Sequence, residues 1–404
     1  MTILIWAIAL AISSPSIVVA AELTARWLIR RRARYYVLPP GMRLRLEPDP
    51  AVSAHMEPVV RFEVNRDGER GGAPPRSRHL YRVLVAGGSQ PEGYLLDQDT
   101  SWPGALQRVL EAPKRLEVLR TRHVHVGSIA RSGVGSEALD LMFERLLSRY
   151  RRLSAIIVLV GASDVLRWLE FDAPSSPPPA VRTSEVFRCH PELAFGWRPA
   201  RLALVECVRR LRHRWLRPLQ VHQHACRWIA RARAMRAHAA TVRAIAPDPA
   251  PMLAHFDHHF RRALARAKAH ADRVIVVRQP WFDRPHSAEE RALMWHGGVG
   301  QAWQEHVSTF YSHEVLSTLM AALDARAASI ARELEIEQLD LMPILERSAR
   351  TYYDFFHATP AGSRAIAAAV AATVLREPLP RPATLAAVGE CSGADTHDLR
   401  QKVS

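Results

Sequence analysis

The segment Arg82–Gly93, RVLVAGGSQPEG, constrains the fold of this chain more than any other stretch. Its short apolar run ends in a glycine pair, which is typical of a buried parallel strand that turns tightly at its carboxyl end. Ser89 follows that turn, and open α/β sheets place their ligands just outside the carboxyl ends of strands. Ser89 could instead only cap the helix that follows, so this segment alone leaves its role open.

A second polar cluster lies far downstream, in the segment TYYDFFHATPAGSRAIAAAV of residues 351–370. Asp354 and His357 stand three residues apart, just ahead of an alanine-rich helix that Pro360 can start. A serine nucleophile needs an imidazole to take its proton, and the imidazole needs a carboxylate to fix its tautomer. Taken with Ser89, the pair predicts a Ser-His-Asp triad. Without Ser89, it would be a surface loop with a stray histidine.

Four blocks, in this order, resemble the signature of the SGNH hydrolases, also called the GDSL family. The first block is GDS-like, with Gly88 in place of the usual aspartate before Ser89. The second supplies Gly133, and the third is Gly-x-Asn-Asp with Ser163 in place of the asparagine. The fourth, Asp-x-x-His, is matched fully by the pair at 354 and 357. The resemblance covers roughly residues 81–374, and four ordered blocks are far more specific than one.

The resemblance also implies an oxyanion hole. In the family, the backbone N–H groups of the serine and the second-block glycine, with the asparagine side chain, meet the charge that develops on the substrate oxygen. The corresponding positions here are Ser89, Gly133 and Ser163. A serine hydroxyl is shorter than an asparagine amide, so this departure bears on catalytic strength. Asp164 is expected to be structural, tying its loop through hydrogen bonds.

Apolar segments alternate with helical ones along the catalytic region. The expected strands are residues 82–86, 124–128, 155–160, 273–277 and 335–339. Alternating strands and helices predict a parallel sheet covered on both faces. We therefore expect a three-layer α/β/α sandwich with a mainly parallel five-stranded sheet, the SGNH/flavodoxin-like arrangement that the resemblance implies.

A helical insertion is expected within this domain of residues 79–377, at about 169–272. Residues 201–217 and 222–245 are rich in arginine and alanine, which predicts helices. The arginines form either a solvated face or a docking surface for an anionic lipid or an acidic polymer. Residues 378–404 are expected to form a disordered tail.

The N-terminal residues predict a membrane anchor. Residues 2–21 are uncharged and mostly apolar, and five arginines follow between residues 26 and 34. A cleavable signal peptide would carry basic residues first, so an uncleaved transmembrane anchor over 1–22 and a single-pass membrane localisation are expected. The positive-inside rule favours a cytoplasmic catalytic domain, whereas related anchored hydrolases face outward, so the side stays open. Residues 23–78 are expected to form a proline-rich, basic tether with short strands near 59–64.

The net charge of +15 predicts an anionic partner. No zinc finger or RNA-binding signature is present in the sequence, so nucleic acid is not expected. The four cysteines form neither a metal motif nor a disulfide framework. His255, His258 and His259 have helical spacing that could hold a metal, but they lack a fourth ligand and are not taken as a site. No cofactor is expected.

The preferred interpretation is a serine-dependent acyl-ester hydrolase that removes an acyl group, acetyl for preference, from a carbohydrate or lipid-linked substrate. The alternatives are an O-acyltransferase with the same triad, and a catalytically degenerate SGNH domain that binds glycan. Gly88 and Ser163 favour the degenerate domain, whereas the intact Asp354–His357 pair speaks against it.

Overall fold

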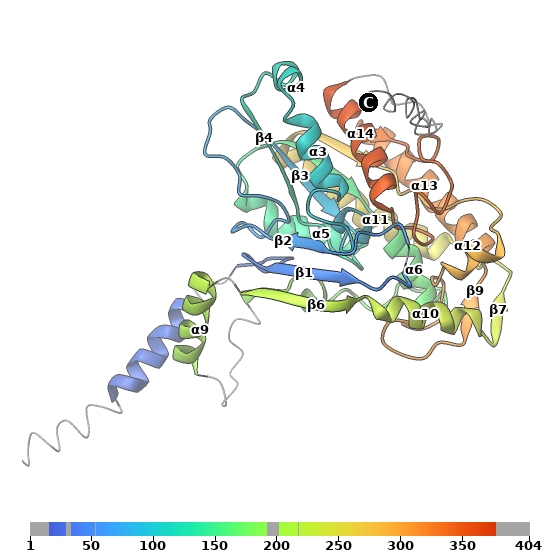
Figure 1. Ribbon diagram of the computed structural model, residues 1–404, viewed down its shortest axis with the longest axis horizontal. Helices are drawn as coiled ribbons and strands as arrows, with labels where there is room; N and C mark the ends of the chain where they lie inside the picture. The colour runs from blue at the N-terminus through green and yellow to red at the C-terminus, as the bar shows by residue number, and fades with distance from the viewer. Residues whose placement is uncertain (1–15, 30–33, 53, 192–201, 217, 377–404) are drawn as a thin grey trace, which may run out of the picture.

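Five parallel strands form the central sheet of the structure, a computed structural model that describes residues 16–29, 34–52, 54–191, 202–216 and 218–376 (Figure 1). The strands are β3 (Leu80–Gly87), β4 (His123–Ser128), β5 (Leu153–Leu159), β8 (Ala271–Val277) and β10 (Glu337–Leu339). Their order is β4-β3-β5-β8-β10, and every neighbouring pair is parallel. The expected mainly parallel five-stranded sheet is confirmed.

The strand order places a ligand-binding crevice beside β3. The chain runs from β3 to β4 on one side and then crosses back to β5 on the other, which is the flavodoxin-like order. The carboxyl ends of β3 and β5 therefore flank a topological switch point, where such sheets bind their ligands. Gly87 permits the close approach of these two strand ends, because a Cβ there would lie 2.0 Å from the carbonyl oxygen of Leu159.

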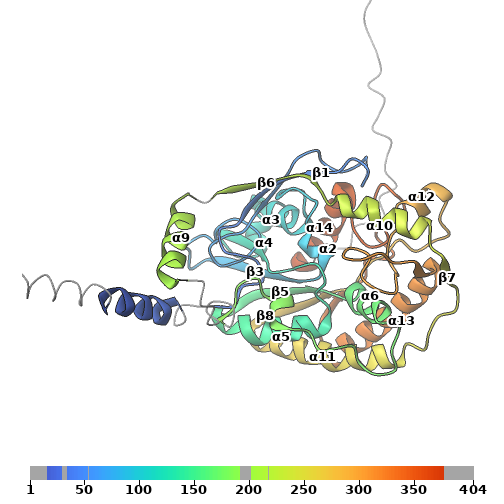
Figure 2. The ribbon, with the colours of Figure 1, turned by 90° about the horizontal axis from the view of Figure 1, so that it is seen from below.

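Helices cover both faces of the sheet and complete three layers (Figure 2). One face carries α3 (Trp102–Leu110) and α14 (Pro360–Leu375), and the other carries α5 (Ser136–Leu146), α11 (Ala250–His270) and α13 (His313–Glu333). The shorter helices are α2 (Ser89–Glu92), α4 (Pro113–Val118), α6 (Ala162–Glu170), α7 (Thr183–Val186), α12 (Ala288–Ala292) and a 3-10 turn at Leu147–Arg149. The hydroxyl of Thr359 caps α14 by accepting the N–H of Gly362 at 3.2 Å, and Pro360 occupies its first turn as expected.

Within the expected tether of residues 23–78, the short strand expected near 59–64 is present at Val60–Glu63, but the described part of the segment is folded and is not an irregular linker. The chain here contributes β1 (Arg43–Pro48) and β2 (Val60–Glu63), which pair with each other in antiparallel orientation. Leu46 and Phe62 from these strands are fully buried in the main hydrophobic core. The segment is therefore part of the folded domain. Every second side chain of β1 points to one face of the strand, and the apolar ones on that face are buried in the core.

The insertion is only partly helical. Helices α9 (Ala203–Leu216) and α10 (Arg227–Ala237) agree with expectation, but residues 222–245 are not one helix. Strand β6 (Leu219–Ala225) pairs with β1, and β7 (Thr241–Arg243) pairs with β9 (Thr309–Tyr311). Helix α11 packs against α5 and the sheet, so it belongs to the α/β/α layers and not to an inserted unit.

The structure corrects the expected membrane localisation: within the part of the chain that it describes, no helix is both long and apolar enough to cross a bilayer. Residues 1–15 of the expected anchor lie outside the described residues, as does the expected tail. The described helix of residues 16–29 carries Glu22, which accepts the N–H groups of Ala203 and Leu204 at the start of α9. The two helices pack side by side through Ala25 and Ile29 (Figure 1).

Candidate active site

The three residues of the expected triad come together at the carboxyl edge of the sheet. Ser89 opens α2 directly after β3, and His357 stands in the loop before α14. The Oγ of Ser89 lies 2.7 Å from Nε2 of His357, and Nδ1 of His357 lies 2.7 Å from Oδ2 of Asp354. Both distances are those of strong hydrogen bonds, in the order that a nucleophile, base and orienting carboxylate require. The 268-residue separation of serine and histidine is closed by the fold.

Asp354 is held ionised and in a fixed orientation. Its side chain is almost completely buried, and its Oδ1 accepts the backbone N–H groups of Phe356 and His357 at 2.9 and 2.8 Å. Burial opposes the charge, but the His357 ring and these hydrogen bonds outweigh it and hold the pKa of Asp354 well below its usual range. The indole Nε1 of Trp295 also donates to Oδ2 at 3.3 Å.

The turn that presents Ser89 is held by hydrogen bonds from the side chain of Arg70. Arg70 is buried and donates to the carbonyl oxygens of Glu92, Gly93 and Leu96, the last at 2.6 Å. Burial lowers the pKa of Arg70 to about 10, which leaves it charged at neutral pH. These bonds satisfy the carbonyl groups at the end of α2, because a helix of one turn cannot satisfy them itself.

Glu92 connects the serine turn to the loop that carries Gly133. Its buried carboxylate accepts both the backbone N–H of Ser132, at 2.8 Å, and the Ser132 hydroxyl. Burial raises the pKa of Glu92. Since Ser132 directly precedes Gly133, this carboxylate ties the helical turn that begins at Ser89 to the loop that carries Gly133.

Gly133 and Ser163 border the same crevice. Gly133 has a φ of +81°, which only glycine adopts readily, and a Cβ there would meet open space. Within the described residues, the N–H groups of Ser89 and Gly133 donate to no protein acceptor. A Cβ at Gly88 would lie 3.4 Å from the Ser163 hydroxyl and 3.1 Å from the Val134 carbonyl oxygen, so there is little room for the aspartate that stands there in the SGNH signature.

A small pocket with a cavity volume of about 30 Å³, open to solvent, extends from these two residues. Gly133 and Ser163 form part of its wall, together with Glu137, Arg167, Trp168 and His255. Asp164 also reaches it, but its Oδ1 accepts the N–H and hydroxyl of Ser136 at 2.8 and 2.6 Å. This tie between α5 and α6 is the structural role expected for Asp164.

Two residues beside the triad were not identified from the sequence. Trp295 and His296 belong to a loop without regular spacing, and they reach Asp354 and His357 only through tertiary packing. His296 is fully enclosed, and burial lowers its pKa to about 3, so its ring is neutral where it packs 5.7 Å from the ring of His357. Glu92 could have been noticed, because it follows Ser89 by one helical turn.

Comparisons with known proteins find similarity only at the level of structure. No family model matches the sequence, and no curated protein matches it. A solved structure of a member of the lipolytic protein G-D-S-L family from Veillonella parvula is 9% identical, with a TM-score of 0.37, and covers 73% of this chain and 97% of that one. Axe2, an acetylxylan esterase from Geobacillus stearothermophilus, is 11% identical, with a TM-score of 0.37, and covers 73% and 93%. Similarity at this level does not assign a function to the chain.

Proposed function

We propose that this protein is a serine-dependent hydrolase of acyl esters. The observation that carries the proposal is the continuous hydrogen-bonded chain from Ser89 Oγ through His357 to the buried carboxylate of Asp354. Structural histidines are common, but a serine at a switch point bonded to a histidine that is itself oriented by a carboxylate is specific to nucleophilic catalysis.

In the proposed first step, Ser89 Oγ attacks the ester carbonyl carbon and forms a C–O bond while its proton passes to His357 Nε2. Asp354 stays ionised and stabilises the imidazolium that results. The carbonyl electron pair moves to oxygen, where the free N–H groups of Ser89 and Gly133, with the Ser163 hydroxyl, would stabilise the negative charge. Collapse of this intermediate expels the alkoxide, which takes the proton from Nε2 and leaves an acyl-serine.

In the second step, a water molecule gives a proton to His357 Nε2 and attacks the acyl carbon. The second intermediate releases the carboxylic acid and returns the proton to Ser89 Oγ. The same acyl-serine could pass its acyl group to a sugar hydroxyl, as in an acyltransferase. No contact in the site favours that acceptor over water, so hydrolysis is the proposal.

The proposed substrate is an acylated carbohydrate, or a lipid carrying one, and its acyl group is small. The pocket beside Gly133 and Ser163 is small, and the guanidinium of Arg167 in its wall is a hydrogen-bond donor. Such a wall suits a hydroxyl-rich molecule better than a long alkyl chain. The assignment to a carbohydrate rests on this chemistry and on the SGNH-like blocks of the sequence.

Purified protein should be incubated with an aryl acetate, with and without a sugar acceptor. A hydrolase releases acetate in proportion to the phenol in both conditions. An acyltransferase would release phenol faster with the acceptor and acetylate the sugar. Absence of turnover for aryl acetates and for acetylated oligosaccharides would contradict the proposal and favour a binding domain.

A further inference from the structure

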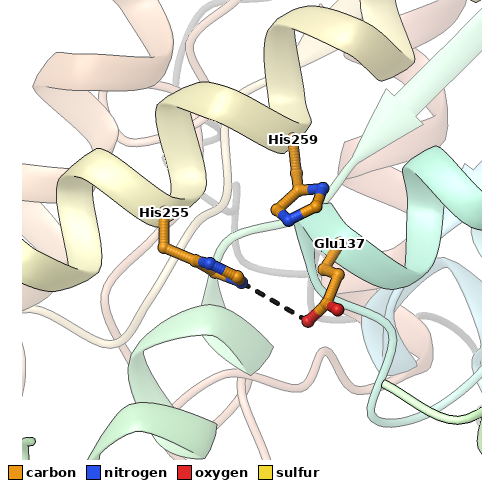
Figure 3. Close-up of side chains that lie close together, drawn as sticks. All are labelled: Glu137, His255 and His259. Carbon is orange, nitrogen blue, oxygen red and sulfur yellow. Dashed lines mark ion pairs between the residues drawn. The ribbon is translucent and has the colours of Figure 1, made fainter. Parts of the chain in front are cut away.

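Three side chains from two helices meet on the face of the sheet that carries α5 and α11. His255 and His259 lie one turn apart on α11, and Glu137 lies in the first turn of α5 (Figure 3). Nε2 of His255 lies 3.4 Å from Oε2 of Glu137, and one donor atom from each residue falls within 4.8 Å of the others. Two imidazoles and a carboxylate are the donor types that zinc prefers.

Further contacts hold each of these side chains in place. Glu137 Oε1 accepts the backbone N–H of Val181 at 3.0 Å, which leaves Oε2 directed toward His255. Nδ1 of His259 faces Asp140 Oδ2 at 3.4 Å, so Nε2 is the ring nitrogen left for a ligand. A carboxylate behind a histidine in this way is the usual support of a metal-binding histidine.

Asp140 is itself fixed by two arginines. Arg262 and Arg266 donate to its two carboxylate oxygens at 3.0 and 2.9 Å. These ion pairs neutralise Asp140, so the carboxylate that remains for a cation at the cluster is that of Glu137.

We propose that Glu137, His255 and His259 form a zinc-binding site with one open coordination position. Zinc bonds to nitrogen and oxygen are about 2.0–2.2 Å long, which places neighbouring tetrahedral ligands about 3.4 Å apart. The His255–Glu137 pair already has that separation. Glu137 and His255 also line the pocket that contains Gly133 and Ser163, so the fourth position faces solvent and a water molecule can fill it.

The chain supplies its own matched control. His258 lies on the same helix between the two proposed ligands, and its exposed ring contacts that of His259 edge-on, but it contributes no donor atom to the cluster. Replacing His258 with alanine should therefore remove one histidine from the same helix and leave zinc affinity unchanged. Glu137→Gln is the conservative ligand variant, because its amide oxygen can keep the Val181 bond while the anionic donor is lost.

The test is titration of chelator-treated full-length protein with zinc chloride, followed by calorimetry and by thermal unfolding. Wild-type protein and His258→Ala should bind one zinc ion per chain and unfold at a higher temperature with zinc. His255→Ala, His259→Ala and Glu137→Gln should each weaken binding by more than about 100-fold. Circular dichroism without zinc should show that these variants remain folded.

Several results would overturn the site. They are the absence of stoichiometric binding in wild-type protein, undiminished binding in His255→Ala and Glu137→Gln, or loss of binding in His258→Ala. Loss of zinc binding in His357→Ala would place the ion at the other possible cluster, His296, Asp354 and His357, and would also contradict the proposal. None of these readouts depends on esterase activity.

Discussion

Replacing Asp354 with asparagine tests how the triad is oriented. Oδ1 of Asp354 accepts two backbone N–H groups, so the amide oxygen of an asparagine must take that position. The amide nitrogen then replaces Oδ2 and faces Nδ1 of His357. Because an amide NH₂ is a donor, it would bond to an unprotonated Nδ1 and leave the ring proton on Nε2. A protonated Nε2 cannot accept the hydroxyl proton of Ser89.

The expected loss follows from this tautomer change. A serine hydrolase triad with its orienting carboxylate replaced by the amide loses about 10⁴-fold in kcat, or about 5.5 kcal/mol of transition-state stabilisation. KM should change little, since no contact to the bound ester is removed. The assay is steady-state hydrolysis of an aryl acetate, with thermal unfolding measured in parallel.

The matched control is Asp272→Asn. Asp272 is exposed and lies at the opposite end of β8 from the site, so the same chemical change there should leave kcat unaltered. A loss of less than about tenfold in folded Asp354→Asn would refute the proposed tautomer role.

Three further predictions concern the surroundings of the triad. Ser163→Ala should lower kcat by about 10- to 1,000-fold with little change in KM, because its bond forms only with the developing oxyanion; unchanged kcat in both Ser163→Ala and Ser163→Asn would remove this residue from the hole. Glu92→Ala should lower kcat by about 10- to 100-fold by releasing Ser132, whereas Glu92→Gln should retain most activity; equal losses would contradict this positioning role. Burial opposes the charge of Glu69, but the bond from His125 and the charge of Arg82 lower its pKa to about 2. Because the pKa of Glu69 is lower in the folded than in the unfolded chain, the ionised carboxylate adds about 3 kcal/mol to the free energy of unfolding. This contribution is present above pH 4.5 and is lost as the pH falls toward 2. Glu69→Gln should therefore flatten the acid limb of the unfolding free energy measured in urea, and an unchanged limb would contradict the assignment.

The sheet could be predicted because its strands carry their signal locally. Residues 155–159 form an uninterrupted apolar run that is fully buried, and the other central strands repeat the pattern more weakly. Of the second sheet, only the strand near 59–64 was expected, and its partners β1 and β6 were missed for a physical reason. All but one residue of β6 are exposed, and β6 is held by backbone hydrogen bonds to β1. Its sequence therefore lacks the alternation of apolar and polar residues that predicts a strand. Strand β1 does alternate, but its arginines and the nearby prolines favoured an irregular tether.

In the site, too, residues in short sequence motifs could be predicted, and residues brought in only by tertiary contacts could not. Ser89, Asp354 and His357 stand in short motifs whose residue types state their chemistry, so they could be proposed before any geometry was known. The bond from Trp295 to Asp354 and the enclosure of His296 depend on a loop that folds back over the triad. The His255–Glu137 contact joins helices far apart in the sequence, and helical spacing alone could supply only the histidine half of that cluster.

Covalent labelling of Ser89 tests the central claim most directly. Wild-type protein and Ser89→Ala would be treated with a fluorophosphonate probe, and the modified residue would be identified by peptide mass spectrometry. The triad predicts that Ser89 alone is labelled in the wild type, that the folded alanine variant is not labelled, and that its esterase turnover falls about 10⁴-fold or more. Undiminished labelling and turnover in Ser89→Ala would contradict the account.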